Sequence, residues 1–170
     1  YQVSNWGADF FSVTKEGHVA VQPKGSGGPS LDLMQIIGDL EEQGFRTPLL
    51  LRFSDILASR LEQITACFGQ AIKTHDYHGH YRPVYPIKVN QQRHVVEEIV
   101  QFGSPLGVGL EAGSRPELLI ALALLEKPDA PIICNGYKDR AYIETALLAQ
   151  QMGRRPILVI DRFRELDRLI

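Results

Sequence analysis

From residue 83 onward, short apolar runs alternate with longer amphipathic segments, and this alternation occurs four times. Short apolar runs predict strands, and segments with apolar residues three or four positions apart predict helices. The predicted strand and helix pairs are 83–89 with 91–102, 107–112 with 115–126, 131–135 with 140–152, and 156–160 with a last helix from residue 163. Successive strands joined through helices run parallel, so the pattern predicts an α/β fold.

A polar residue stands at or just after the end of each predicted strand. These residues are Lys88, Glu111, Asn135 and Asp161, which lie 23, 24 and 26 positions apart. Repeats of this length favour the first half of a (β/α)8 barrel of the TIM type, in which the carboxyl ends of the strands form the catalytic rim. A doubly wound sheet, whose strand order reverses after the first strand, is the alternative.

Lys88 is the most informative of these residues. Strict alternation along 83–89 places it on the face opposite Tyr85, Ile87 and Val89, which is the face that a barrel encloses. Burial lowers the pKa of a lysine and makes its amine a nucleophile, which suits Schiff-base formation with a substrate carbonyl or with pyridoxal phosphate. A surface lysine that extends from a strand end into water is the structural alternative.

Glu111 is expected on the same face as Lys88, one strand away. Neighbouring strands are about 4.8 Å apart, so the two side chains are predicted to be close. Gly109 and Gly113 flank Glu111 on that face and leave room beside the lysine for a flat group. With Asn135, these residues form a candidate site at the rim.

Several neighbouring polar residues have a structural interpretation instead. Glu117 follows Ser114 at the spacing of a capping box, and Asn90, Asp139 and Asp161 stand where helix N-caps are expected. We expect Lys138, just beyond the third strand, to be solvated.

The N-terminal part has a different pattern. Residues 9–22 alternate between apolar and polar and predict a β-hairpin. Ser30 is a predicted N-cap for a helix that ends at Gly44. Residues 47–53 are predicted to form a strand, followed by a second helix over 54–73.

Composition narrows the functional class. The chain has 170 residues, 44% of them hydrophobic, and a net charge of −2, so neither nucleic acid nor a membrane is expected as a partner. Cys67 and Cys134 lack metal-ligand spacing and are expected to be reduced core residues of a cytoplasmic protein. His78 and His80 have no further ligands nearby, so no metal site is predicted.

The two ends of the sequence suggest a longer protein. The first residue is Tyr, and the last helical pattern stops before any capping residue. We therefore expect an incomplete chain, and we expect half a barrel, with its open sheet edges, to be inactive by itself.

Four segments resemble the biosynthetic arginine decarboxylases of bacteria and plants. These enzymes depend on pyridoxal phosphate and are built on an alanine-racemase-like barrel. The matching segments are WGADFFSV from Trp6 with the later Gly17-His18, YPIKVNQ from Tyr85, GLEAGS from Gly109, and ICNGYKD from Ile133. The resemblance extends over essentially all 170 residues.

The resemblance implies the roles of several residues. Lys88 would hold pyridoxal phosphate as an internal aldimine, Glu111 would be a catalytic residue beside it, and Asn135 is assigned to cofactor binding. Residues 1–45 would contribute to a β-domain, and residues 46–170 would form the first part of the pyridoxal-phosphate-binding barrel. The resemblance also implies a homo-oligomer and a possible Mg²⁺ requirement. The phosphate-binding loops and the substrate-binding carboxylates of the family would lie beyond Ile170.

The implied reaction is the decarboxylation of the small molecule L-arginine to agmatine and CO2, in polyamine biosynthesis. One alternative is another decarboxylase of the group, which acts on diaminopimelate, ornithine or carboxynorspermidine. The segment around Trp6 argues against it, because those enzymes lack this extension. The other alternative is a non-catalytic pyridoxal-phosphate carrier, which would not need the hairpin over 9–22.

Overall fold

The structure is a computed structural model that describes all residues from 1 to 170. The chain folds into two compact units, Tyr1–Arg60 and Leu61–Ile170. The domain boundary that the resemblance implies, between residues 45 and 46, stays a prediction. None of the helices combines the length and the apolar composition that crossing a lipid bilayer requires.

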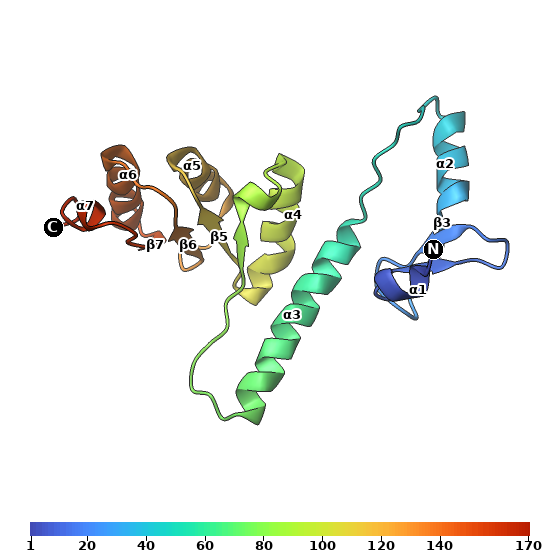
Figure 1. The fold of residues 1–170 in the computed structure, drawn as a ribbon, viewed down its shortest axis with the longest axis horizontal. Helices are drawn as coiled ribbons and strands as arrows, with labels where there is room; N and C mark the ends of the chain where they lie inside the picture. The colour runs from blue at the N-terminus through green and yellow to red at the C-terminus, as the bar shows by residue number, and fades with distance from the viewer. The chain divides into compact units, whose positions relative to one another are not determined.

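The first unit contains a small antiparallel sheet after the short helix α1 (Val3–Trp6). Its strands are β1 (Phe11–Val13), β2 (Val19–Val21) and β3 (Leu31–Asp32), paired in that order. The pairing of β1 with β2 confirms the predicted hairpin, and Figure 1 shows the turn that joins them. Ala20 and Val21 are buried and form the core of this sheet.

Helix α2 (Leu33–Glu42) begins two residues later than predicted, because Asp32 and not Ser30 is its N-cap. One carboxylate oxygen of Asp32 accepts the Met34 N–H at 2.8 Å, and the other lies 2.8 Å from Nδ1 of His18. The bond to His18 is the main reason that the pKa of Asp32 is lowered. This carboxylate therefore joins the hairpin to the helix.

The strand predicted over 47–53 is not formed, and this prediction is wrong. These residues are irregular, and Leu50 is 75% exposed. An apolar run becomes a strand only when a neighbour supplies hydrogen bonds, and no segment of the chain pairs with this one. The helix predicted next is confirmed as α3 (Ser54–Thr74).

The second unit is built on four parallel strands. They are β4 (Val84–Pro86), β5 (Gly109–Ala112), β6 (Pro131–Cys134) and β7 (Arg155–Leu158). They lie side by side in chain order, with the register Pro86, Glu111, Ile133 and Ile157 across the sheet. A doubly wound sheet would reverse this order after the first strand, so the structure confirms the first half of a (β/α)8 barrel.

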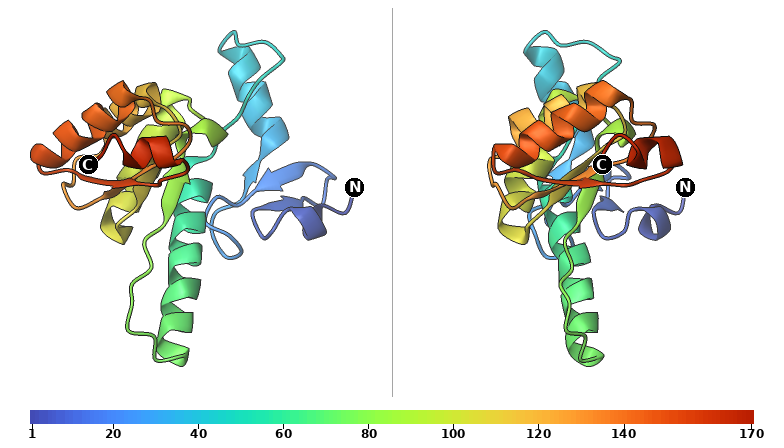
Figure 2. Two further views of the ribbon diagram at one scale, coloured as in Figure 1. Left: turned by 60° about the vertical axis from the view of Figure 1, so that its left-hand side comes forward. Right: turned by 90° about the vertical axis from the view of Figure 1, so that its left-hand side faces the viewer.

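Helices cover one face of this sheet. They are α4 (Arg93–Gly103), α5 (Arg115–Leu124) and α6 (Arg140–Gln151), with the short α7 (Phe163–Leu166) after β7. Figure 2 shows α5 and α6 side by side over the strands. The core between the layers contains Val96, Leu110, Leu118, Ile132 and Tyr142. The opposite face of the strands, which carries Glu111, is the one that the prediction assigned to the barrel interior.

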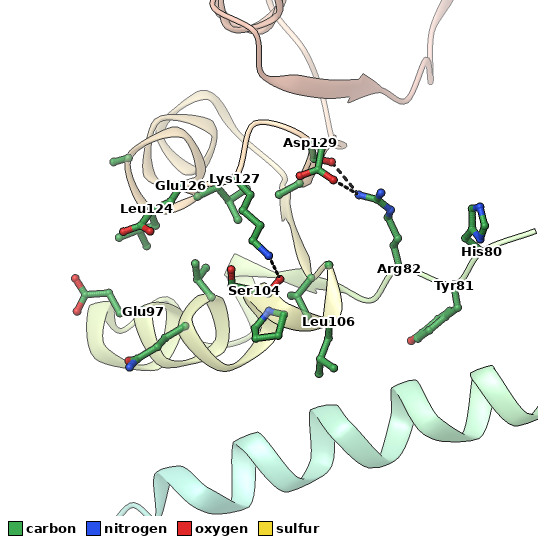
Figure 3. A pocket seen from close by; sticks show the side chains of 18 of the residues that line it. His80, Tyr81, Arg82, Glu97, Ser104, Leu106, Leu124, Glu126, Lys127 and Asp129 are labelled. Carbon is green, nitrogen blue, oxygen red and sulfur yellow. Dashed lines mark hydrogen bonds and ion pairs between the residues drawn. The ribbon is translucent and has the colours of Figure 1, made fainter.

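A cavity of about 920 Å³ lies between α4 and α5 at the amino ends of the strands. Figure 3 shows two of its cations bound to the protein: Arg82 contacts Asp129 at 3.3 Å, and the Lys127 ammonium donates to the Ser104 carbonyl at 2.7 Å. Lys88 follows β4 at the other end of the parallel sheet. This cavity is therefore separate from the predicted rim site.

Candidate cofactor-binding site

Lys88 lies in a short turn and not in a strand. Strand β4 ends at Pro86, and Ile87–Val89 form a single turn of 3₁₀-helix. Successive side chains in such a turn are rotated by about 120° instead of 180°. Ile87 is consequently buried while Val89 is exposed, so the strand alternation predicted beyond Pro86 is wrong.

The expected burial of the Lys88 ammonium is also wrong for this structure. The side chain is 63% exposed at the open carboxyl end of the sheet. Its Nζ nevertheless lies 3.6 Å from Oε1 of Glu111. The turn therefore brings the amine to the predicted neighbour without enclosing it.

Glu111 is held by its strand. The flanking Leu110 and Ala112 are completely buried toward the helices, so the pleat directs Glu111 to the opposite face, where it is 14% exposed. Asn135 Nδ2 donates to the same Oε1 atom of Glu111 at 3.4 Å. The structure thus brings together all three residues predicted for the site, Lys88, Glu111 and Asn135, which we call the rim cluster.

The rim cluster adds little to the stability of the fold. An exposed lysine–carboxylate pair contributes about 0–1 kcal/mol to the free energy of unfolding. The amine remains accessible, with a carboxylate nearby and space on the open face. This arrangement suits chemistry at the amine better than it suits a structural role.

Asp161 does not join the rim cluster. It follows β7 by three residues, and its carboxylate lies 4.0 Å from the guanidinium of Arg162. The N-cap of α7 is Arg162, so the capping interpretation of Asp161 is also wrong. Residues 159–161 are irregular, and the Asp161 N–H binds the Glu165 carboxylate.

The capping interpretations hold at the starts of α5 and α6. Ser114 Oγ accepts the Glu117 N–H, and Glu117 Oε2 accepts the Gly113 N–H at 2.7 Å, one residue earlier than in a standard capping box. Asp139 caps α6 by accepting the Tyr142 N–H at 2.8 Å.

Asn90 acts just before its helix. Its side-chain oxygen accepts the Gln92 N–H at 3.1 Å, while α4 begins at Arg93. The bond therefore fixes the turn between Lys88 and α4 and is not a helix cap.

The prediction for Lys138 is wrong. Its side chain is 0% exposed, and its Nζ lies 3.1 Å from Oε2 of Glu165, which is 1% exposed. The same Nζ donates to the Gly136 carbonyl at 2.6 Å. These two charges are 27 residues apart in irregular or short segments, so no local periodicity in the sequence indicates that they pair.

Glu165 is held as a carboxylate by its neighbours. Burial alone would raise its pKa, but the N–H groups of Lys138 and Asp161 and the Lys138 ammonium lower the pKa to about 2. Both N–H bonds are 3.0 Å long, one to each carboxylate oxygen. Sequence analysis missed this buried ion pair, which lies beside the loop that carries Asn135.

Tyr142 connects α6 to the sheet below the rim cluster. Its hydroxyl donates to the Ala112 carbonyl at 2.6 Å, one residue beyond Glu111. Burial is the main cause of the raised pKa of Tyr142, and burial also raises the pKa of the nearby Cys134 thiol. Cys134 is a free core cysteine as predicted, whereas Cys67 is exposed on α3 and not in the core.

The loops after β5 and β6 meet without side chains between them. Gly136 has a positive φ of 69°, and a Cβ atom there would collide with the Gly113 carbonyl oxygen. A side chain at position 136 would therefore push the two loops apart. Glycine at position 136 therefore lets the loop that follows Asn135 approach the loop that follows Glu111.

Comparison with known proteins identifies the family. Residues 61–170 match the family described as pyridoxal-dependent decarboxylase, pyridoxal binding domain. Over its full length, the chain is 58% identical to the biosynthetic arginine decarboxylase of Gloeobacter violaceus and 52% identical to that of Nostoc sp.. It covers 26% and 25% of those two proteins, so it spans about a quarter of the curated relatives it matches.

A solved structure agrees with this assignment. The crystal structure of the biosynthetic arginine decarboxylase SpeA from Campylobacter jejuni superposes with a TM-score of 0.90 at 35% identity, over 98% of this chain and 27% of that one. The family match covers well over half of the residues, and the parallel half-barrel has the fold expected for it. The chain therefore belongs to the family of pyridoxal-binding domains of pyridoxal-dependent decarboxylases.

Proposed function

We propose that the full-length protein decarboxylates L-arginine to agmatine and CO2, with pyridoxal phosphate bound covalently to Lys88. The observation that carries the proposal is the rim cluster, in which an accessible amine lies 3.6 Å from Glu111 at the carboxyl ends of β4 and β5. This is the end of the strands at which barrel enzymes have their active sites. The named relatives support arginine, over diaminopimelate, ornithine or carboxynorspermidine, as the substrate.

The residues present fit the cofactor. A primary amine is the group that attaches pyridoxal phosphate, and Lys88 offers one on the open face of the sheet. At Gly113 and Gly136 the two neighbouring loops meet through backbone atoms alone. When bound, the cofactor supplies an electron sink for the loss of the α-carboxylate.

The other two residues would control the lysine. Glu111 places its carboxylate 3.6 Å from Nζ of Lys88, so a negative charge faces the amine. Asn135 donates to the carboxylate oxygen that faces the lysine and restricts its orientation.

Other expectations extend the proposal. We propose that residues 1–45 contribute to a β-domain and residues 46–170 to the barrel of the complete protein. Homo-oligomeric assembly and a Mg²⁺ requirement are carried over from the family resemblance. Size-exclusion chromatography and activity measurements after chelation test them directly.

The decisive experiment locates the cofactor. The full-length protein, prepared with pyridoxal phosphate, is reduced with borohydride and digested, and the modified peptide is identified by mass spectrometry. We expect a pyridoxyl group on Lys88 and agmatine as the product when arginine, ornithine, diaminopimelate and carboxynorspermidine are supplied separately. Lys88→Ala should remove both the label and activity.

Lys127→Ala is the matched control, because Lys127 lies at the amino ends of the strands, where its ammonium binds the Ser104 carbonyl. This variant should keep the label and the activity. A label on another lysine would disprove the proposed attachment, and turnover of a different amino acid would disprove the proposed substrate.

A further inference from the structure

Asn135 follows β6 directly at the edge of the sheet, and the loop that it begins returns to the interior three residues later. The Asn135 N–H still bonds the Ala112 carbonyl at 2.9 Å, Gly136 turns the chain with its positive φ, and Tyr137 is exposed. The next residue, Lys138, is completely buried. The position of Asn135 therefore depends on what holds Lys138.

Glu165 holds it from the segment after β7. One of its oxygens accepts the Lys138 N–H and the other accepts the Asp161 N–H, and the Lys138 ammonium lies 3.1 Å away. Arg168 adds a bond to the Lys138 carbonyl at 3.2 Å. One carboxylate thus ties together the loops that follow β6 and β7.

The Lys138 ammonium connects the Glu165 carboxylate to the backbone beside the rim cluster. It donates to the Gly136 carbonyl at 2.6 Å, and Gly136 in turn lies against the Gly113 backbone. Gly113 is fixed by Glu117 through the 2.7 Å bond to its N–H. Asn135 is the residue immediately before this clamped glycine.

The hydrogen bond between Asn135 and Glu111, which depends on this arrangement, is long. Asn135 Nδ2 reaches Glu111 at 3.4 Å, so a displacement of a few tenths of an ångström is enough to break it. Stability alone is a weak reason for a buried ion pair, because apolar residues of similar volume often fold equally well. A role in positioning accounts for both the burial and the location of the pair.

We propose that Lys138 and Glu165 are positioning residues of the cofactor site, which hold Asn135 against Glu111 and thereby set the environment of the Lys88 amine. Both side chains are buried, and neither belongs to the rim cluster. The catalytic part of this inference rests on the proposed function. Its structural content, the coupling of Glu165 to Lys88 through Asn135, can be measured without substrate.

The experiment is a double-mutant cycle in the full-length protein with Asn135→Ala and Glu165→Gln. The first readout uses cofactor-free protein, in which the rate of Lys88 modification by acetic anhydride is followed against pH by mass spectrometry. The second is kcat and KM for arginine in the loaded enzyme. Glu144→Gln is the matched control, because it breaks an exposed pair with Arg140 on α6.

If Glu165 acts through Asn135, each single variant moves the pH midpoint of Lys88 modification in the same direction. Each also lowers kcat by about tenfold to a hundredfold, with KM nearly unchanged, as misplacement of catalytic groups does. The double variant then loses no more than Asn135→Ala alone, because coupled residues are not additive. Glu144→Gln leaves both readouts unchanged.

Additive effects, or an unchanged pH midpoint in Glu165→Gln, overturn the proposal and leave the pair with a purely structural role. If Glu165→Gln does not fold, Arg168→Ala, which loosens the same loop by one bond, replaces it in the cycle. Failure of the proposed function is distinguishable, because it shows as no borohydride label on Lys88 or no agmatine from the unmodified protein.

Discussion

The second unit contains two lysine–glutamate pairs that differ in almost every physical respect. Lys88 and Glu111 lie 3.6 Å apart, with the lysine 63% exposed. Lys138 and Glu165 lie 3.1 Å apart, and water reaches neither side chain. Both pairs stand at the carboxyl ends of neighbouring strands, so the contrast arises from burial and from the number of hydrogen bonds.

The difference shows that burial does not mark the reactive lysine in this chain. The ammonium of Lys138 is bound by Glu165 and by the Gly136 carbonyl, and its surroundings leave no space for a ligand. Lys88 has one long ionic contact and remains open. A lysine that must exchange covalent partners needs to be accessible and only weakly bound by its neighbours. A lysine that fixes a loop needs to be buried and bound by several groups.

The largest effect on stability is expected from breaking the buried pair. Lys138→Met leaves Glu165 buried without its counter-ion, and loss of one partner of a buried pair costs about 3–5 kcal/mol in the free energy of unfolding. Lys88→Met should change the same quantity by less than about 1 kcal/mol, because its pair is exposed. Urea denaturation of the cofactor-free full-length protein measures both changes, and similar values for the two variants would contradict the contrast.

Glu111→Gln is expected to affect turnover and leave folding nearly intact. Two charges about 4 Å apart interact with about 1–4 kcal/mol for effective dielectric constants between 80 and 20. Since about 1.4 kcal/mol corresponds to tenfold in rate, we expect kcat to fall by a factor between about five and about a thousand. Cofactor affinity, measured by equilibrium dialysis, should change less than kcat. Unchanged turnover would mean that Glu111 has no role in catalysis.

Acid should reveal the buried pair. The pKa of Glu165 is about 2 in the folded protein and near the ordinary 4.5 when unfolded. The unfolded chain therefore binds the proton first, so this contribution to stability is complete above about pH 4.5 and is lost as the pH falls toward 2. In Glu165→Gln the unfolding free energy should fall less steeply across this window, and equal slopes in the two proteins would refute the assignment.

The smallest expected effect is that of salt. Raising the ionic strength from about 0.1 M to about 1 M shortens the Debye length from about 10 Å to about 3 Å. The influence of Glu111 on Lys88, measured as the difference in lysine modification between wild type and Glu111→Gln, should shrink. The stability difference between wild type and Lys138→Met should stay the same, because solvent ions do not reach that pair.

Local patterns were sufficient to predict the fold of the second unit and the membership of its rim cluster. Glu111 stands between two apolar residues of a strand, so its face followed from alternation alone. Lys88 came next to it for a different reason, since the 3₁₀ turn after Pro86 replaced the predicted strand. The prediction of proximity was therefore right, although the backbone geometry assumed for it was wrong.

The features that were missed depend on partners distant in sequence. Residues 47–53 have the composition of a strand but no neighbour to pair with, and composition cannot report a missing partner. Asp32 replaced Ser30 as the helix cap because His18, on the hairpin, binds its second oxygen. The pairing of Lys138 with Glu165 joins two segments that each resemble solvated polar surface.

Glu165 follows its partner Lys138 by 27 residues, so the ribosome synthesises the lysine first and its counter-ion later. A ribosome adds about 5–20 residues per second, so about one to five seconds separate the synthesis of Lys138 from that of its counter-ion. During this interval the chain already contains β4, β5 and β6, but the loop after β6 would have to bury an uncompensated charge. In the nascent half-barrel, Lys138 is therefore expected to stay exposed to solvent until the segment after β7 has emerged from the ribosome.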